Sequence, residues 1–349
     1  MKAAIIDVAG TELTKEEADF FKSAQPWAFI LFGRSCQNPQ QIRKLCDDIR
    51  NSVDRDCLIF LDQEGGRVQR LKPPQFPQFP PNEIYGRLFI EDEGKALEAV
   101  YLHHLLIAAE LRAVGINADC APCVDLSING AHSVIGDRAF SANPETISKL
   151  GHAAINGLHD GKVASVIKHI PGHGRARADS HHELPVVEES IQDLQLDFAP
   201  FKALKDAPMA MTAHVKYTNL DTEYCATLSP TIIKNLIREE FGFNGLLMTD
   251  DISMKALKGS LEEKAKGAIN AGCDVAMLCN APLEQRIEFT SACPELAGIA
   301  LERAINSEKV VMGAPKTFDY EDAWSRFAAL TGIEKGTMLS LAPDPTERV

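Results

Sequence analysis

The sequence predicts an α/β fold of the (β/α)₈ barrel type, built as a single domain. Two observations carry this prediction: short apolar runs recur along the chain, and segments with helical periodicity lie between them. This alternation is typical of βα units and a parallel sheet. A length of 349 residues suits a one-domain α/β barrel. A doubly wound sheet is the alternative, and it is disfavoured because no G-x-G-x-x-G pattern follows the first apolar run.

Eight of the apolar runs have the length and composition of buried strands. Each is bounded by polar or turn-forming residues, as expected for strands of a parallel sheet. The predicted strands cover residues 3–7, 28–32, 57–62, 117–122, 164–169, 210–214, 245–250 and 274–279.

The segments between these strands carry apolar residues at i, i+3 and i+4, which predicts helices. Two of them begin with a capping residue followed by proline, namely Asn143 before Pro144 and Ser229 before Pro230. Helices are predicted over residues 39–52, 95–114, 144–159, 191–204, 230–240 and 261–271. Residues 1–339 are assigned to the barrel, and residues 340–349 to a flexible C-terminal tail.

Composition and charge exclude several classes of protein. With 45% hydrophobic and 24% charged residues, the chain has enough apolar surface for a globular core. The net charge is -13, and no basic run interrupts the acidic balance. Because binding to nucleic acid depends on phosphate neutralisation, we expect no nucleic-acid partner.

The cysteines and the hydropathy indicate an intracellular protein. Nine cysteines without regular spacing argue against a disulfide framework. Cys120 and Cys123 form one C-x-x-C without a second pair, so buried thiols are expected there rather than a redox or zinc site. No secretory signal and no apolar stretch of roughly 18 to 20 residues is found. We expect a cytoplasmic monomer without membrane contact.

Polar residues collect at the ends of the predicted strands. Barrel enzymes carry their chemistry on the loops at the carboxyl ends of the strands. Charged groups gathered on that rim would be buried together, so each needs a partner or a ligand. The polar residues at these strand ends are Asp62, Gln63, Glu64, Arg67, Lys168, His169, His214, Asp250, Asp251 and Asn280.

Asp250 ends the seventh strand and follows Leu246-Leu247-Met248-Thr249 directly. A carboxylate at the mouth of an apolar strand is placed to serve as a nucleophile or as a metal ligand. Asp251 should face the other way, because successive strand residues point to opposite sides. Asp251 is kept as the alternative nucleophile.

The loop after the fifth strand carries a candidate acid/base pair, Asp179 and His181. A carboxylate two residues before a histidine can accept a hydrogen bond from one ring nitrogen and raise the imidazole pKa. Asp179 would thus orient and tune His181, which could protonate a leaving group and later activate water. Gly172 and Gly174 bracket His173 and suit a tight phosphate-type turn or a loop that moves.

Several motifs occur together and in register. They are L-D-Q-E-G-G-R-V-Q-R at 61–70, I-G-D-R-A-F at 135–140, K-H-I-P-G-H-G at 168–174, D-S-H at 179–181, M-T-A-H-V at 211–215 and M-T-D-D-I-S-M at 248–254. This set resembles glycoside hydrolase family 3, and more narrowly its single-domain bacterial β-N-acetylglucosaminidases of peptidoglycan recycling. The resemblance spans roughly residues 29–280.

The resemblance implies a barrel and retaining hydrolysis through a glycosyl-enzyme intermediate on Asp250. It also implies that His181, assisted by Asp179, replaces the carboxylic acid of most retaining glycosidases. The substrate would be a terminal, non-reducing β-1,4-linked N-acetylglucosamine on GlcNAc-anhydroMurNAc-peptides, with no cofactor and no metal. Implied sugar contacts are Asp62, Arg70, Arg138, Lys168 and His169, with His214 and Asn280 as further candidates.

Two positions depart from the family pattern. Ile170 stands where the family usually has an aromatic residue, and His182 adds a second histidine beside His181. His181 is retained as the acid/base because it matches the spacing of the motif.

Three other functions use the same residues. A metal-dependent barrel hydrolase could bind its ion with His169, His173, His181, Asp179 and Asp250. It is disfavoured because no H-x-H closes the first strand. A sugar-binding protein without catalysis would use the same pocket for sensing. A phosphorylase would pass the glycosyl intermediate to phosphate instead of water.

Overall fold

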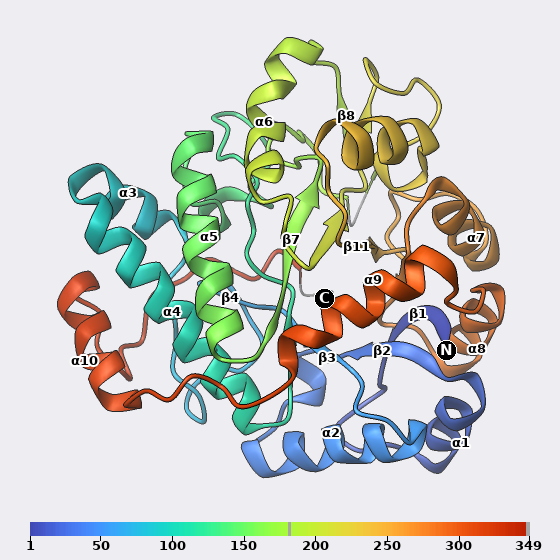
Figure 1. The fold of residues 1–349 in the computed structure, drawn as a ribbon, viewed down its shortest axis with the longest axis horizontal. Coiled ribbons are helices and arrows are strands. Elements are labelled where there is room, and N and C mark those ends of the chain that lie inside the picture. The colour runs from blue at the N-terminus through green and yellow to red at the C-terminus, as the bar shows by residue number, and fades with distance from the viewer. Residues whose placement is uncertain (181–182, 347–349) are drawn as a thin grey trace.

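A computed structural model of the chain describes residues 1–180 and 183–346. Eight parallel strands form a closed barrel, which confirms the predicted fold, and each predicted strand overlaps one of them (Figure 1). The strands are β1 (Lys2–Asp7), β2 (Pro26–Ile30), β3 (Ile59–Leu61), β6 (Ala118–Asp119), β7 (Ala164–Ile170), β9 (Met209–Thr212), β11 (Leu246–Asp251) and β12 (Val275–Leu278). They follow one another around the barrel in sequence order, and β12 closes on β1.

Helices surround the barrel, and all six predicted helices are present (Figure 1). The helices are α1 (Lys15–Ala24), α2 (Pro39–Val53), α3 (Glu83–Glu91), α4 (Glu93–Ala113), α5 (Pro144–Asp160), α6 (Ile191–Ala203), η4 (Ile232–Glu240), α7 (Leu261–Ala271), α8 (Leu283–Ala292), α9 (Gly298–Glu308) and α10 (Tyr320–Thr331). Short 3₁₀ turns are η1 (Gly33–Ser35), η2 (Gly136–Arg138), η3 (Ala226–Leu228) and η5 (Lys309–Val311).

Both predicted helix starts are capped as expected. The Asn143 side chain accepts hydrogen bonds from the backbone N of Glu145 and Thr146, at 2.9 and 3.3 Å. The Ser229 hydroxyl accepts one from the backbone N of Ile232, at 3.0 Å. These side chains satisfy N–H groups that have no acceptor within the first helical turn.

Successive side chains of each strand point alternately into two apolar layers. Ile5 of β1 packs inside the barrel with Ile30, Phe60 and Met248, whereas Ile6 packs in the layer between strands and helices. This alternation follows from the two-residue repeat of a strand. Every barrel strand is therefore buried on both faces, which is why the sequence shows continuous apolar runs.

The amino ends of the strands are covered by α9. Glu308, at the end of α9, accepts a hydrogen bond from Nε1 of Trp27 at 2.7 Å. Arg303 of α9 donates to Asp274, just before β12, at 3.0 Å. Figure 1 shows α9 crossing the barrel on this side. Because α9 covers the amino ends, a site is expected among the loops at the opposite, carboxyl ends of the strands.

Two small sheets extend the loops at the carboxyl ends. One joins β4 (Gln63–Gly65) to β5 (Val68–Gln69), and the other joins β8 (Val186–Val187) to β10 (Lys216–Tyr217). The first hairpin turns at Gly65, whose φ is 94°, and a Cβ there would lie 2.6 Å from the Pro80 carbonyl oxygen. Glycine is required for this turn, which returns the chain toward β3.

Beyond α10 the chain runs back to the carboxyl side of the barrel. The backbone N of Leu339 donates to Oε1 of Gln78 at 2.8 Å, and the Arg70 side chain contacts Asp344 and Thr346. The flexible tail over residues 340–349 stays a prediction. All nine cysteines are free thiols, in line with the expectation from their spacing. Among the residues that the structure describes, no helix combines the length and apolarity needed to cross a bilayer.

Candidate active site

A pocket of about 60 Å³ lies at the carboxyl ends of the barrel strands. Its walls come from loops that follow β2, β3, β6, β7, β11 and β12, together with the C-terminal segment. Seven of the predicted site residues line it: Asp62, Arg70, Arg138, Lys168, His169, Asp250 and Asn280.

A chain of buried charges begins at the ends of β3 and β7. Nζ of Lys168 donates to Oδ1 of Asp62 at 2.9 Å and lies 2.6 Å from Oε1 of Glu64. Burial alone would raise the pKa of the Asp62 carboxyl, but the charges of Lys168 and Arg70 outweigh it and hold that pKa below its usual range. Asp62 is therefore ionised at neutral pH and keeps Lys168 ionised.

Glu64 links this lysine to Arg138. Nε and Nη2 of Arg138 donate to the two Glu64 oxygens, at 3.0 and 2.8 Å, in a bidentate arrangement. Burial would raise the pKa of Glu64, but Arg138 and Lys168 lower it to about 2. Glu64 was not predicted as a site residue. Its position two residues after Asp62 was the available signal, because alternate residues of an extended segment face the same side.

Arg70 is brought to the pocket by the β4–β5 hairpin. The Gln63 side-chain oxygen accepts hydrogen bonds from the backbone N of Arg70 and Leu71, at 2.9 and 3.0 Å. Nη2 of Arg70 then donates to Oδ2 of Asp62 at 3.2 Å. The residue next to Asp62 in sequence thus sets where the arginine lies.

Asp250 and Asp251 end β11, and both line the pocket. Oδ1 of Asp250 accepts a hydrogen bond from the backbone N of Asp251 at 2.7 Å. The Asp251 carboxylate accepts from the Ser253 hydroxyl at 2.6 Å and from the backbone N of Cys279 at 3.0 Å. Asp251 therefore ties the loop after β11 to the end of β12, a structural role that supports Asp250 over Asp251 as the nucleophile.

His214 lies beside the pocket and is not among its lining residues. Its Nδ1 is 2.7 Å from the Thr227 hydroxyl, and its Nε2 is 3.0 Å from the Asp251 carbonyl oxygen. Burial lowers the pKa of His214, although the charge of Asp250 opposes this effect. Since both ring nitrogens are engaged, His214 supports the backbone next to Asp250.

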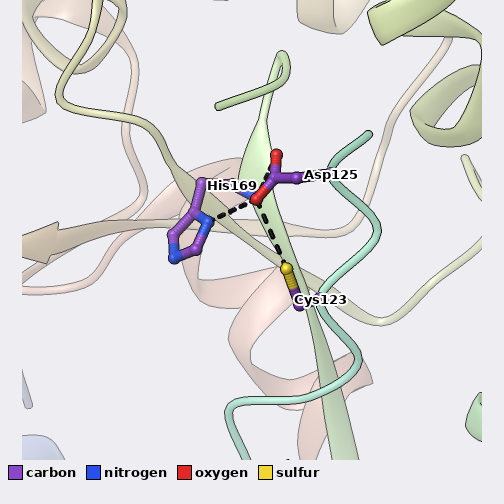
Figure 2. A group of neighbouring side chains, drawn as sticks. All are labelled: Cys123, Asp125 and His169. Atoms are coloured by element: carbon purple, nitrogen blue, oxygen red, sulfur yellow. Dashed lines mark hydrogen bonds and ion pairs between the residues drawn. The ribbon is translucent and has the colours of Figure 1, made fainter. Parts of the chain in front are cut away.

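The His169 ring is held by a buried carboxylate, Asp125 (Figure 2). Nδ1 of His169 lies 2.7 Å from Oδ2 of Asp125, whose Oδ1 also accepts from the backbone N of His173 at 2.6 Å. Burial would raise the pKa of Asp125, but the neighbouring His169 and these hydrogen bonds lower it to about 2. A carboxylate at Nδ1 keeps the proton on that nitrogen and leaves Nε2 for the pocket.

Asp125 was missed because it lies beyond the predicted fourth strand, in a segment that reads as a loop. Cys123, Asp125 and His169 are close enough to hold a metal ion. The residues do not fit one well, because Asp125 already accepts three N–H groups and burial raises the pKa of the Cys123 thiol well above its usual range. The group acts as a hydrogen-bonded support for His169.

The loop after β7 returns to the pocket at Ser180, which lines it. The Ser180 hydroxyl donates to Sδ of Met254 at 3.8 Å, and its carbonyl accepts from the backbone N of Ala256 at 3.3 Å. The carbonyl of Asp179 accepts from the backbone N of Glu183 at 3.0 Å. The segment with Asp179 thus lies beside the loop that follows Asp250. His181 and His182 lie outside the described residues.

Asn280 joins the pocket to a second, larger groove of about 790 Å³. Its backbone N donates to Oδ2 of Asp7 at 2.6 Å, and its side-chain oxygen accepts from Arg34. Burial raises the pKa of Asp7 to about 6 against the opposing charge of Arg34. Pocket and groove share Phe32, Arg70, Asn280 and Thr346.

Comparison with known proteins places this arrangement in context. The sequence model named "Glycosyl hydrolase family 3 N terminal domain" matches residues 2–309. A protein of Thiobacillus denitrificans named Beta-hexosaminidase is 38% identical over 283 residues, which cover 80% of this chain and 78% of that protein. Another of the same name from Bordetella avium is 36% identical over 296 residues, 82% of this chain and 84% of that protein.

Solved structures resemble the whole barrel. NagZ from Neisseria gonorrhoeae, in complex with N-trifluoroacetyl-D-glucosamine, superimposes with a TM-score of 0.85 at 31% identity, over 95% of this chain and 98% of that one. A family 3 β-N-acetylglucosaminidase from a Paenibacillus species superimposes with a TM-score of 0.83 at 28% identity, over 94% of this chain and 67% of that one.

Proposed function

Because the chain belongs to glycosyl hydrolase family 3, we propose that this glycoside hydrolase is a retaining β-N-acetylglucosaminidase with Asp250 as its nucleophile. One observation carries the proposal. Asp250 opens into a pocket whose other predicted walls are charged donors and acceptors suited to sugar hydroxyls. The names of its relatives, and the glucosamine derivative bound to one solved neighbour, support the choice of sugar.

In the first step, a carboxylate oxygen of Asp250 forms a bond to the anomeric carbon. The bond from that carbon to the leaving-group oxygen breaks, and His181 transfers its proton to that oxygen. In the second step, His181 takes a proton from water, the water oxygen bonds to the anomeric carbon, and Asp250 leaves as a carboxylate. Two displacements at one carbon retain the β configuration.

Asp179 would orient His181 and stabilise its charged form. The short separation in sequence lets the Asp179 carboxylate reach one ring nitrogen and direct the other to the leaving group. The packing of Ser180 against Met254 supports this role, because it brings the loop of Asp179 next to that of Asp250.

The buried charges would select the sugar. Asp62 and Lys168 stay ionised at neutral pH and offer an acceptor and a donor to adjacent hydroxyls. Arg138 supplies a further donor, and the Nε2 atom of His169 supplies a further acceptor. A substrate that lacks one of these hydroxyls would leave a buried charged group unpaired, which costs binding energy.

The expected natural substrates are GlcNAc-anhydroMurNAc-peptides released from the cell wall. A cytoplasmic monomer that removes the terminal β-1,4-linked N-acetylglucosamine from them fits the acidic surface and the thiols. Cells that lack the gene should accumulate the uncleaved disaccharide peptide. Normal levels of that peptide would count against this biological role while leaving the chemistry untouched.

Kinetics on an aryl β-N-acetylglucosaminide test the chemistry. Asp250→Ala should lower kcat by about three to five orders of magnitude, and azide should restore part of the rate as glycosyl azide. The wild type should release β-N-acetylglucosamine first, as followed by NMR. A rate that requires phosphate and yields a sugar 1-phosphate would instead favour a phosphorylase. Sugar binding without turnover would favour a sensor.

A further inference from the structure

Residues 339–346 reach the pocket, although they lie beyond the family match, which stops at residue 309. The Asp344 carboxylate pairs with Nη1 of Arg70, and the two side chains are only 3% and 1% exposed. The Thr346 hydroxyl accepts a hydrogen bond from Nη2 of Arg70 at 2.7 Å. A predicted substrate contact therefore has two partners from the end of the chain.

The segment has its own local structure. The backbone N of Thr346 donates to Oδ1 of Asp344 at 2.8 Å, and the Thr346 hydroxyl donates to the same oxygen at 2.7 Å. This is the turn that an aspartate forms with a residue two positions on. A second anchor, the hydrogen bond between Leu339 and Gln78, lies five residues before Asp344.

The segment adds a second carboxylate partner to the Arg70 side chain. Nη2 reaches Asp62 at 3.2 Å, but Asp62 also accepts from Lys168 at the shorter distance of 2.9 Å. Asp344 pairs with the other terminal nitrogen, Nη1, so the two carboxylates hold the guanidinium from both ends. Nε of Arg70 is buried without a hydrogen-bond partner among the described residues.

Thr346 lies between the pocket and the groove. It lines both the small pocket that contains Asp250 and the groove of about 790 Å³ beside it. Arg70 and Phe32 line both as well, and the Arg70 guanidinium lies 5.8 Å from the centre of the Phe32 ring. Thr346 thus completes a wall that the barrel loops begin.

We propose that the segment from Leu339 to Thr346 is a lasting part of the substrate pocket, in which Asp344 positions Arg70 for the sugar and Thr346 separates the pocket from the groove. This inference rests on the proposed glycosidase function. Asp344 is a positioning residue, because it acts through Arg70.

The burial of the pair favours a lasting wall over a plug that leaves in each turnover. Release of the segment would break an ion pair whose two side chains are 3% and 1% exposed, and would leave the Arg70 guanidinium with the 3.2 Å contact to Asp62. Removing one partner of a buried ion pair is unfavourable.

The test compares Asp344→Asn, Asp344→Glu and a chain that ends at Leu339 with the wild type on an aryl β-N-acetylglucosaminide. Asp344→Asn should raise KM about tenfold, the effect of weakening one charge-assisted hydrogen bond, with kcat within about threefold. The shortened chain should lose at least as much, and Asp344→Glu should recover part of the loss. Glu334→Gln, an exposed charge change before the segment, should match the wild type.

A double-mutant cycle shows whether the effect passes through Arg70. In an Arg70→Ala background, Asp344→Asn should change KM by less than about twofold, because the group it positions is gone. Equal effects in both backgrounds would overturn the positioning role. An unchanged KM in Asp344→Asn, or a rise in kcat/KM after truncation, would overturn the wall and would indicate an inhibitory tail.

Amide hydrogen exchange separates this inference from the proposed function. The Thr346 amide should exchange slowly in the wild type and fast in Arg70→Ala, whatever the enzyme hydrolyses. If the wild type lacks turnover but shows this pattern, the proposed function fails and the wall stands. Fast exchange of the Thr346 amide in the wild type would overturn the proposed wall but not the proposed function.

Discussion

Nδ1 of His169 lies 2.7 Å from the Asp125 carboxylate, although 44 residues separate the two in sequence. Asp125 also accepts hydrogen bonds from the backbone N of His169 and of His173. One buried carboxylate therefore fixes the ring that faces the pocket and the first turn of the loop that leads to Asp179. A side chain at a functional site depends on such a hydrogen-bonded neighbour for its orientation.

Asp125→Asn should lower kcat/KM about 10- to 100-fold, because the amide can present a donor to Nδ1 and turn the His169 ring. Cys123→Ala is the matched control, because its thiol contacts the same carboxylate at 3.5 Å through a weaker hydrogen bond. Comparable losses in both variants would indicate general damage to the fold.

Chelation should leave activity unchanged. Cys123, Asp125 and His169 are near enough to bind an ion, but the hydrogen bonds of Asp125 already occupy its oxygens. Activity after exhaustive treatment with EDTA, with elemental analysis of the purified protein, measures this. Loss of activity that zinc restores would revive the metal-dependent hydrolase.

Glu64→Gln should destabilise the protein by about 3 kcal/mol at neutral pH, because it leaves Arg138 and Lys168 without their shared carboxylate in a buried site. Urea unfolding measures this loss. Glu93→Gln, at an exposed ion pair with Lys149, is the control and should change stability by less than about 1 kcal/mol.

The role of Glu64 can also be tested by the pH dependence of the free energy of unfolding. The pKa of Glu64 is lowered from 4.5 to about 2 in the folded protein, so its contribution is present above pH 4.5 and is lost as the pH falls toward 2. The wild type should therefore lose stability over this range more steeply than Glu64→Gln. Parallel curves would show that Glu64 is not ionised in the folded state.

Asp119 should give a pH dependence of stability opposite to that of Glu64. Burial raises its pKa from 3.8 to about 8, with Asp62 and Glu64 adding to the shift and Lys168 opposing it. The folded state then binds a proton that the unfolded state releases, so stability falls as the pH rises from 4 to 8. Asp119→Asn keeps the side-chain oxygen that accepts from Gln63 and should gain at least about 1 kcal/mol on the wild type at pH 8 relative to pH 5. An identical pH dependence in both proteins would contradict the raised pKa.

The sequence by itself determined the barrel and the rim on which the pocket lies. Apolar runs that are buried on both faces, and helical repeats between them, are local patterns, and each of the eight predicted strands overlaps a strand of the closed barrel. Asp62, Lys168 and Asp250 could be placed at the pocket because they directly follow such runs, and parallel strands bring their carboxyl ends together.

Only the tertiary structure decided which charges meet. Glu64 pairs with Arg138 across 74 residues and Arg70 with Asp344 across 274, and no local pattern indicates either partner. His214 and Asp251 also end strands, but the barrel turns His214 toward Thr227 and Asp251 toward Ser253. Periodicity predicts which face of a strand a side chain occupies. The partner of a buried charge depends on the closure of the barrel and on where distant segments, such as the loops and the segment that carries Asp344, come to lie.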